Sequence, residues 1–358
     1  MFRLIIVMLV PLLSFSQKKI TILDKYNKKS LIGVNILSKE GAFLLSTDNK
    51  GHVNIEYLEE AGIKDIIIYD PNYNLLEYKI NKVPKIIYLE EKKAVLLETI
   101  TIKSKLKKGE YFIVHGYIRS WQLVNNKLIK YGDALIEYHI PYKKQENSVV
   151  TGIKNYITAY RTFKTDSIKQ KSRIISFSRK DNFLDYHIPR KNILIKQDYE
   201  DYKIAQNKDS LYNIYKENKK IGYVIYNKEK LPITIVISEN SEENEEIKSS
   251  FWKLSAHSKN TEKWLGEGLE RHLSYSFSSE KILIETKLGD KVVETINEIF
   301  INNKISYNLT KPKKSKRFLD IDRSYYIDKY WNKQILEHQL PSNIKKQLTS
   351  INENKNTY

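Results

Sequence analysis

Cysteine is absent from this chain of 358 residues. Its absence excludes disulfides, thiolate metal sites and a cysteine nucleophile. A chain without disulfides is held together by packing, and a composition of 41% hydrophobic and 29% charged residues is sufficient to build a core. The length predicts two or three domains.

The motifs of several enzyme classes are also missing. None of the seven histidines is followed by Glu three residues later, as a His-x-x-Glu zinc pair requires. The residue at that position is Ile118 after His115 and Tyr275 after His272. The sequence contains no His-Glu-x-x-His helix, Gly-x-Ser-x-Gly elbow, P-loop or Gly-x-Gly-x-x-Gly fingerprint. We therefore assign no catalytic, cofactor-binding or metal-binding residue and expect no cofactor.

One cluster of polar residues is compatible with catalysis. Glu267, Glu270 and His272 lie within six residues of one another, beside Trp264 and Arg271. These residue types suit a general acid/base or metal patch, but their spacing fits no known ligand geometry. We interpret them as surface charges on a loop that leads into a strand.

Two other candidate sites have simpler interpretations. Asp320, Asp322 and Asp328 lie close together, but the segment lacks the Gly and terminal Glu of a calcium loop. We interpret it as a solvated helix start. Trp121 and Trp264 would suit stacking on sugars if exposed, and burial is the interpretation that we favour.

The N-terminus reads as a secretory signal peptide. Arg3 supplies a positive n-region, Leu4–Leu13 forms the apolar h-region, and small residues precede a predicted cut before Gln17. The apolar run is shorter than the about 20 residues that a membrane span needs. We expect residues 1–16 to be removed, leaving no transmembrane segment, and the chain to be exported to the periplasm or the outer membrane.

Charge is distributed unevenly. The formal net charge is +18; residues 17–104 carry 14 Lys/Arg and 12 Asp/Glu, whereas residues 105–358 carry 46 and 31. Export argues against nucleic acid as a partner. Anionic lipid or polysaccharide of a cell envelope is compatible with the basic second part, and a Lys-rich solvated surface is the plainer interpretation.

Residues 17–104 show short, regularly spaced strands that predict a small β-sandwich. Asp48 and Gly51 occupy the favoured first and fourth positions of a type I turn. The alternating run His52–Tyr57 predicts a half-buried strand after this turn. Leu31–Leu37 predicts another strand, in which Gly33 marks a bulge or a close backbone approach.

The order of these elements resembles the carboxypeptidase-regulatory-like domain, a transthyretin-like β-sandwich of exported Bacteroidota proteins. The resemblance is carried by Asp24, Leu31–Ile36, Thr47–Ile55, Ile66–Tyr69 and the closing segment Leu96–Ile102. It covers about 85 residues, and it implies a non-catalytic accessory module. In that family the domain often precedes an outer-membrane receptor, but the remaining 254 residues are too few for a plug and a barrel of 22 strands.

Lys105–Glu110 is a charged connector, and residues 111–358 predict a basic, antiparallel β-rich domain of about eight strands, of which a curved half-barrel is one possible form. Helices are expected in Asp198–Tyr215, Arg323–Trp331 and Ser342–Leu348, and hairpin turns at Gly289-Asp290 and Asn302-Asn303.

The function expected from the sequence is non-catalytic binding in the cell envelope, with a protein, a glycan or a lipid as partner. The alternative is an envelope hydrolase that uses an acid pair in the second domain. A deep pocket lined by two close carboxylates would favour the enzyme, whereas a flat basic face or an apolar groove would favour binding.

Overall fold

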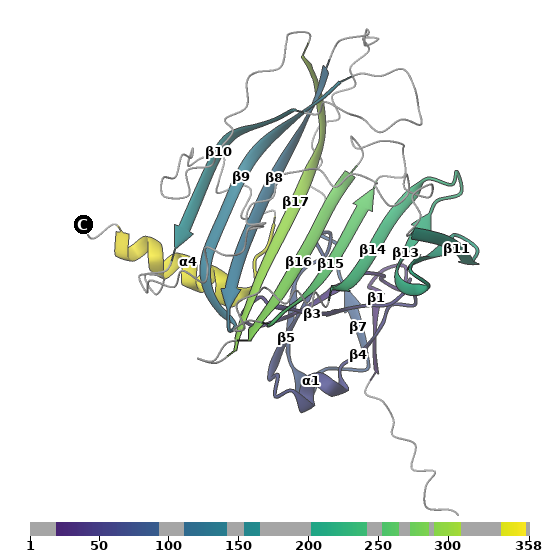
Figure 1. The fold of residues 1–358 in the computed structure, drawn as a ribbon, viewed down its shortest axis with the longest axis horizontal. Helices are drawn as coiled ribbons and strands as arrows, with labels where there is room; N and C mark the ends of the chain where they lie inside the picture. The colour runs from purple at the N-terminus through teal and green to yellow at the C-terminus, as the bar shows by residue number, and fades with distance from the viewer. Residues whose placement is uncertain are drawn as a thin grey trace, which may run out of the picture. The chain divides into compact units, whose positions relative to one another are not determined.

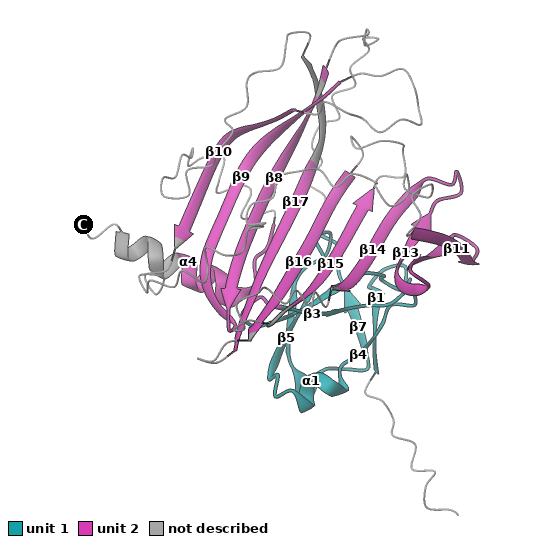
Figure 2. Ribbon diagram, in the orientation of Figure 1, with its two compact units in different colours: residues 1–39, 43–93 teal, residues 40–42, 94–358 magenta. Residues whose placement is uncertain are grey.

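The structure, a computed structural model, is mainly β, as the sequence predicts, and divides into two compact units (Figure 2). Unit 1 comprises residues 1–39 and 43–93, and unit 2 comprises residues 40–42 and 94–358. The structure describes residues 19–92, 111–141, 154–164, 202–241, 253–264, 273–285, 290–308 and 338–355. The expected signal peptide, the connector at 105–110 and the closing segment Leu96–Ile102 lie outside these ranges and stay predictions.

Unit 1 is a sandwich of two sheets (Figure 1). One sheet has the order β4-β1-β7 and the other the order β3-β2-β5-β6. The strands are β1 (Lys19–Asp24), β2 (Asn35–Ser38), β3 (Phe43–Ser46), β4 (His52–Asn54), β5 (Asp65–Tyr69), β6 (Leu76–Lys79) and β7 (Ile86–Leu89). β1 pairs antiparallel with β4 and parallel with β7.

The core of unit 1 consists of alternating aliphatic side chains that both sheets direct inward. Ile22, Val34, Ile36, Ile66 and Leu89 are fully enclosed. Because a chain without disulfides depends on such burial, these residues provide most of the stabilisation of this unit.

The predicted turn after β3 is confirmed. The Gly51 amide donates to the Asp48 carbonyl oxygen at 3.0 Å, and Gly51 has φ +73°. The Asp48 carboxylate also accepts hydrogen bonds from the amides of Lys50 and His52, both at 2.8 Å.

Two strand predictions in unit 1 need correction. The strand expected over His52–Tyr57 ends at Asn54, and Glu56–Glu60 forms the short helix α1, which buries Leu58. The side chain of Asn54 accepts the Glu56 amide at 3.0 Å and turns the chain. The strand expected over Leu31–Leu37 begins only at Asn35, because Gly33 has φ +71° and interrupts the extended backbone.

Unit 2 is built on one sheet of ten strands, in the order β10-β9-β8-β17-β16-β15-β14-β13-β12-β11. Every neighbouring pair is antiparallel. The first five strands are β8 (Tyr111–Val124), β9 (Lys127–Pro141), β10 (Lys154–Lys164), β11 (Tyr202–Lys208) and β12 (Leu211–Lys216). The other five are β13 (Lys219–Tyr226), β14 (Pro232–Ser241), β15 (Lys253–Trp264), β16 (Leu273–Glu285) and β17 (Lys291–Asn308).

The described part of this sheet is open, with β10 and β11 as its two edges, and it twists steadily between them (Figure 1). It has more strands than the eight expected. The helix expected over Asp198–Tyr215 is wrong, because the described part of that stretch forms the hairpin β11–β12, with Asp209 at φ +43° in the turn. The turn expected at Asn302-Asn303 is also wrong: β17 continues through it with a register shift against β8.

The helix expected over Ser342–Leu348 is confirmed as part of α4 (Ser342–Lys355). Ile344 and Leu348 are buried on one side of it, as their spacing of four residues predicts. The helix expected over Arg323–Trp331 lies outside the described residues.

Candidate functional site

One face of the ten-stranded sheet is apolar over most of its width. We define the apolar face by the buried cluster of Val114, Ile118, Ala134, Ile136, Tyr138, Ile140, Ile157, Tyr160, Ile214, Ile221, Val224, Ile235, Ile237, Trp264, Leu273, Ile299 and Ile301. Tyr202, Ile204, Tyr212 and Tyr226 are partly buried and pack against this cluster.

The pairing register shows how continuous this face is. One row crosses nine adjacent strands from β10 to β12; its members are Tyr160, Ala134, Ile118, Ile299, Ser276, Glu262, Ile235, Val224 and Tyr212. Only Ser276 and Glu262 interrupt the row with polar groups. Glu262 accepts a hydrogen bond from the indole nitrogen of Trp264 at 3.0 Å, which satisfies one of its oxygens.

The opposite face carries buried charges, and we call it the charged face. Arg161, Asp133, Arg119 and Glu298 occupy directly paired positions on β10, β9, β8 and β17. Their signs alternate along this row, so every charge has an opposite charge beside it. Such cross-strand pairs stabilise a sheet, whereas like charges in the same places would destabilise it.

Asp133 is fully buried at the centre of three polar partners. Arg161 donates two hydrogen bonds to it, both of 2.8 Å, and the hydroxyls of Tyr117 and Tyr131 donate at 3.0 and 3.1 Å. Burial raises the pKa of Asp133, and the hydrogen bonds from Arg161 and the tyrosines act against this rise. Asp133, Arg161, Tyr117 and Tyr131 therefore form one hydrogen-bonded group.

Arg119 is the other centre of the charged face. Its Nε donates to Glu298, and Glu298 also accepts the Tyr275 hydroxyl at 2.7 Å. The two remaining guanidinium nitrogens donate to the carbonyl oxygens of His338 and Gln339 at 2.8 and 2.9 Å. A side chain within the sheet thereby holds the segment that leads into α4.

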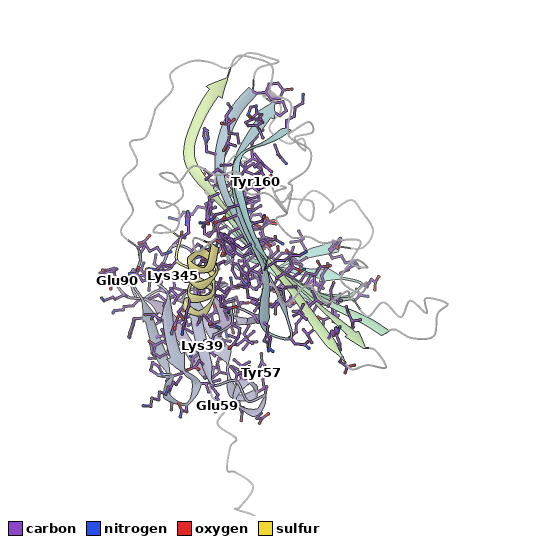
Figure 3. The ribbon with its side chains drawn as sticks, turned by 90° about the vertical axis from the view of Figure 1, so that its left-hand side faces the viewer. Lys39, Tyr57, Glu59, Glu90, Tyr160 and Lys345 are labelled. Atoms are coloured by element: carbon purple, nitrogen blue, oxygen red, sulfur yellow. The ribbon has the colours of Figure 1, made fainter. Side chains whose placement is uncertain are left out.

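The His338 ring strengthens this attachment. It stacks on Phe300 with ring centroids 3.9 Å apart and on Tyr117 at 5.4 Å. α4 therefore lies on the charged side of the sheet, as the edge-on view in Figure 3 shows. It is the only helix in the described part of unit 2, so no described helix covers the apolar face.

Lys259 also lies on the charged face, opposite Ser279 of β16. Burial lowers the pKa of Lys259 to about 8. Burial of an amine by itself indicates no chemistry.

The site residues considered from the sequence have different outcomes. Trp121 and Trp264 are buried, as the favoured interpretation predicts, so neither presents a stacking surface. Glu267, Glu270, Arg271 and His272 lie outside the described residues, as do Asp320, Asp322 and Asp328. Both of these clusters therefore remain untested.

Sequence reasoning missed the charged face entirely. None of Arg119, Asp133 and Glu298 is among the candidate site residues predicted from the sequence. The sequence does hold a partial indication that Arg119 is buried. Arg119 lies between the aromatic residues Tyr117 and Trp121 on alternate positions, so the three side chains share one face of the strand. The pairing with Glu298, 179 residues away, depends on register.

Within the described residues, no group of three His, Asp or Glu side chains is arranged to hold a metal ion. Among the described helices, none is both long enough and apolar enough to cross a membrane.

Comparison with known proteins leaves the family of this chain open. No protein-family model matches the sequence, and no curated protein matches it. A solved structure described as "Lipid-protein interactions in lipovitellin" aligns with a TM-score of 0.24 and 8% sequence identity, over 59% of this chain and 27% of that one. This chain thus spans about a quarter of the protein it matches, and a TM-score of this size does not establish a shared fold.

Proposed function

We propose that this chain is a non-catalytic binding protein of the cell envelope and that the apolar face of unit 2 binds the acyl chain of a lipid. The observation that supports this proposal is the continuous apolar row across nine strands of a single open sheet. A sheet with one apolar face needs a second layer over that face. The side chains of the apolar face are buried, and an acyl chain can join their cover, without polar contacts, at the partly buried margin formed by Tyr202, Ile204, Tyr212 and Tyr226.

The dimensions and the charge suit such a ligand. Neighbouring strands lie about 4.8 Å apart, so a row across nine strands is roughly 38 Å wide. This is long enough for an extended acyl chain. Residues 105–358 carry 46 Lys/Arg against 31 Asp/Glu, and this excess of positive charge favours an anionic headgroup.

The hydrolase alternative receives less support from the same geometry. Asp133 and Glu298 are buried carboxylates on either side of Arg119, but each is bound by an arginine and by at least one tyrosine hydroxyl. A general acid or base needs a proton-transfer path to a substrate. Side chains so fully occupied by their neighbours serve to hold the sheet together.

The proposed cellular location and the proposed role of unit 1 rest on the sequence alone. The N-terminal pattern of a signal peptide supports export. The resemblance of residues 17–104 to the carboxypeptidase-regulatory-like domain supports an accessory role for unit 1.

Titration of the full chain with the fluorescent fatty acid cis-parinaric acid tests the proposal. Ile204→Asn and Tyr212→Ser change partly buried residues at the margin of the apolar face. A buried apolar side chain contributes about 1.5–3 kcal/mol, so each variant should weaken binding at least about tenfold. Tyr215→Ser is the matched control, because Tyr215 shares the opposite side of β12 with Asn213, whose amide donates to its hydroxyl.

Two results would contradict the proposal. One is the absence of saturable binding by the wild-type chain. The other is an equal loss of affinity in Tyr212→Ser and Tyr215→Ser, which would place the fatty acid elsewhere. Native mass spectrometry of the chain purified from the envelope would show which lipid it carries.

A further inference from the structure

Unit 1 has an uneven distribution of exposed hydrophobic side chains. Of the described residues, four large hydrophobics are exposed: Tyr26 (66%), Tyr57 (45%), Ile86 (49%) and Tyr88 (44%). Ile86 and Tyr88 alternate on β7, and Tyr26 lies in the turn after β1, where its hydroxyl donates to Glu90 at 2.9 Å. Three of the four therefore gather on one surface, and such a gathering on a small domain marks a binding surface.

A pocket opens at this surface. It is lined by Lys25, Lys28, Asn74, Leu76, Tyr88 and Glu90, and its volume is about 490 Å³. Sites for small molecules have volumes of this order, whereas a protein partner needs a wider surface of about 800 Å² on each side. The volume therefore suits one or two sugar-sized rings.

The turn that carries Tyr26 and Lys28 is held in place by a buried carboxylate. Asp24 accepts hydrogen bonds from the amides of Tyr26 and Asn27 at 2.8 and 2.9 Å and from the Tyr73 hydroxyl at 2.9 Å. The hydrogen bond from the Asn27 amide is the main reason why the pKa of Asp24 is lowered. The turn is thus rigid before any ligand arrives, which reduces the entropy lost on binding.

Two ammonium groups and one carboxylate line the pocket. Glu90 accepts a hydrogen bond from the Lys25 ammonium at 2.8 Å, which neutralises that lysine. The Lys28 ammonium lies 4.3 Å from the centre of the Tyr88 ring and donates to the Lys25 carbonyl oxygen at 2.7 Å. No described carboxylate lies within salt-bridge distance of Lys28. Asp24 acts on Lys28 electrostatically, but its carboxylate is occupied by the amides of Tyr26 and Asn27 and by the Tyr73 hydroxyl. The Lys28 ammonium can therefore still pair with an anion next to an aromatic ring.

Polar recognition is also available. Among the described residues, none forms a hydrogen bond with the side-chain amide of Asn74, which offers both a donor and an acceptor to hydroxyl groups. The rings of Tyr26 and Tyr88 present faces of negative potential. The C–H bonds of a pyranose ring, which carry partial positive charge, pack well against such faces.

We propose that unit 1 binds an acidic saccharide in this pocket: the carboxylate of the sugar pairs with Lys28, and the sugar ring takes the place of the Lys28 ammonium on the Tyr88 ring. A fatty acid would suit the pocket less well, because its chain would bury the ammonium groups without replacing their water. The ligand class follows from the combination of an aromatic ring, a lysine without a salt bridge and a side-chain amide that no described residue contacts by a hydrogen bond. This site is independent of the apolar face of unit 2.

Isothermal titration of the full chain with a galacturonic acid oligomer tests this proposal. The corresponding neutral galactose oligomer and inorganic phosphate serve as comparison ligands. Tyr88→Ala and Lys28→Ala should each weaken binding of the acidic oligomer at least tenfold, and Tyr88→Phe should retain it because the ring remains. Raising the salt concentration should weaken binding by the wild type more than by Lys28→Ala.

Matched controls come from the same unit. Tyr57 is as exposed as Tyr88 but lies at the other end of unit 1 from Glu90 (Figure 3), and Lys50 is an exposed lysine in a different turn. Tyr57→Ala and Lys50→Ala should bind like the wild type. Equal affinity for the neutral oligomer, equal affinity for phosphate, or equal losses in Tyr88→Ala and Tyr57→Ala would each overturn the proposal.

Discussion

At the scale of single residues, the buried charges of the charged face are the most sensitive positions in unit 2. Asp133→Asn removes the negative charge that Arg161 contacts with two nitrogens. Breaking a buried ion pair by changing one partner costs about 3–5 kcal/mol, because the other charge is left uncompensated. Urea unfolding should show a loss of stability of that order.

The control for Asp133→Asn is a substitution in an exposed ion pair. Lys39 and Asp65 are 3.8 Å apart, with side chains 53% and 34% exposed. Lys39→Gln should change stability by about 0–1 kcal/mol. A similar, small effect of both substitutions would show that Asp133 and Arg161 are not buried as described.

The tyrosines of the same network predict a loss of stability in alkali. Burial raises the pKa of both Tyr117 and Tyr131 above the ordinary value of 10.0. Above pH 10 the unfolded chain loses these protons while the folded chain keeps them, so stability falls as pH rises. Each residue contributes up to about 1.4 kcal/mol per pH unit.

Unfolding free energies between pH 9 and 11 measure this effect. Tyr131→Phe should give a shallower decrease with pH than the wild type, even though its stability at neutral pH is lower. Parallel pH profiles for the two proteins would mean that Tyr131 ionises equally in both states.

At the scale of elements, Gly222 fixes how closely β13 and β14 approach. A Cβ at this position would lie 2.0 Å from the Val236 carbonyl oxygen, which is backbone and cannot rotate away. Gly222→Ala should therefore force the two strands apart and lower stability by more than about 3 kcal/mol, beyond the range of ordinary substitutions. Thermal unfolding followed by circular dichroism measures the loss.

Gly116→Ala is the control in the same sheet. Its Cβ would meet the side chains of Ile136 and Tyr138 at 3.0 Å, and these can shift by a few tenths of an ångström. A smaller loss of stability is expected. If Gly222→Ala lowered stability less than Gly116→Ala, the description of a close approach between β13 and β14 would be wrong.

The attachment of α4 to the sheet depends on Arg119. Arg119→Gln removes the donors to His338 and Gln339, so the segment should open locally more often. Trypsin should then cut after the exposed residues Lys345 and Lys346 roughly ten times faster, as mass spectrometry of timed digests would show.

Arg161→Gln separates this local effect from a general loss of stability. It also removes a buried arginine, but one that bonds Asp133 and not the segment before α4. Equal cleavage rates in the two variants would contradict the specific role of Arg119.

Elements whose residue preferences or spacing are visible within a few positions could be predicted from the sequence. Elements that depend on which strands pair could not. The Asp48–Gly51 turn follows from residue preferences at four positions, and α4 follows from the spacing of Ile344 and Leu348. The hairpin β11–β12 was mistaken for a helix because its polar residues alternate weakly; four of the seven residues of β11 are exposed in succession. Its strand character comes from pairing with β12, which in turn pairs with β13.

The charged face shows the same limit for the site. The sequence reveals Arg119 and Glu298 as separate charges, and only the register of β8 with β17 places them side by side. A shift of one residue would move every such side chain to the other face. Composition could therefore indicate a basic, mainly β domain, but not which charges are buried.

At the scale of the whole molecule, the division into two units has a direct consequence. Unit 1 has its own core, in which Ile22, Ile36 and Ile66 are fully enclosed. Its two sheets are paired entirely within residues 19–89. A domain with its own core and its own strand pairing can fold by itself.

We therefore expect residues 17–93, expressed alone, to fold. The fragment should show β-sheet circular dichroism and a cooperative urea transition, with modest stability because a chain of this size buries only about 60% of its surface. Ile36→Ala is the test of packing: it removes a fully buried side chain and should lower stability by about 2–5 kcal/mol, enough to unfold a domain of this size. The exposed Ile86→Ala should have little effect. A fragment without a cooperative transition, or one that tolerates Ile36→Ala and Ile86→Ala equally, would show that unit 1 does not fold around the core described.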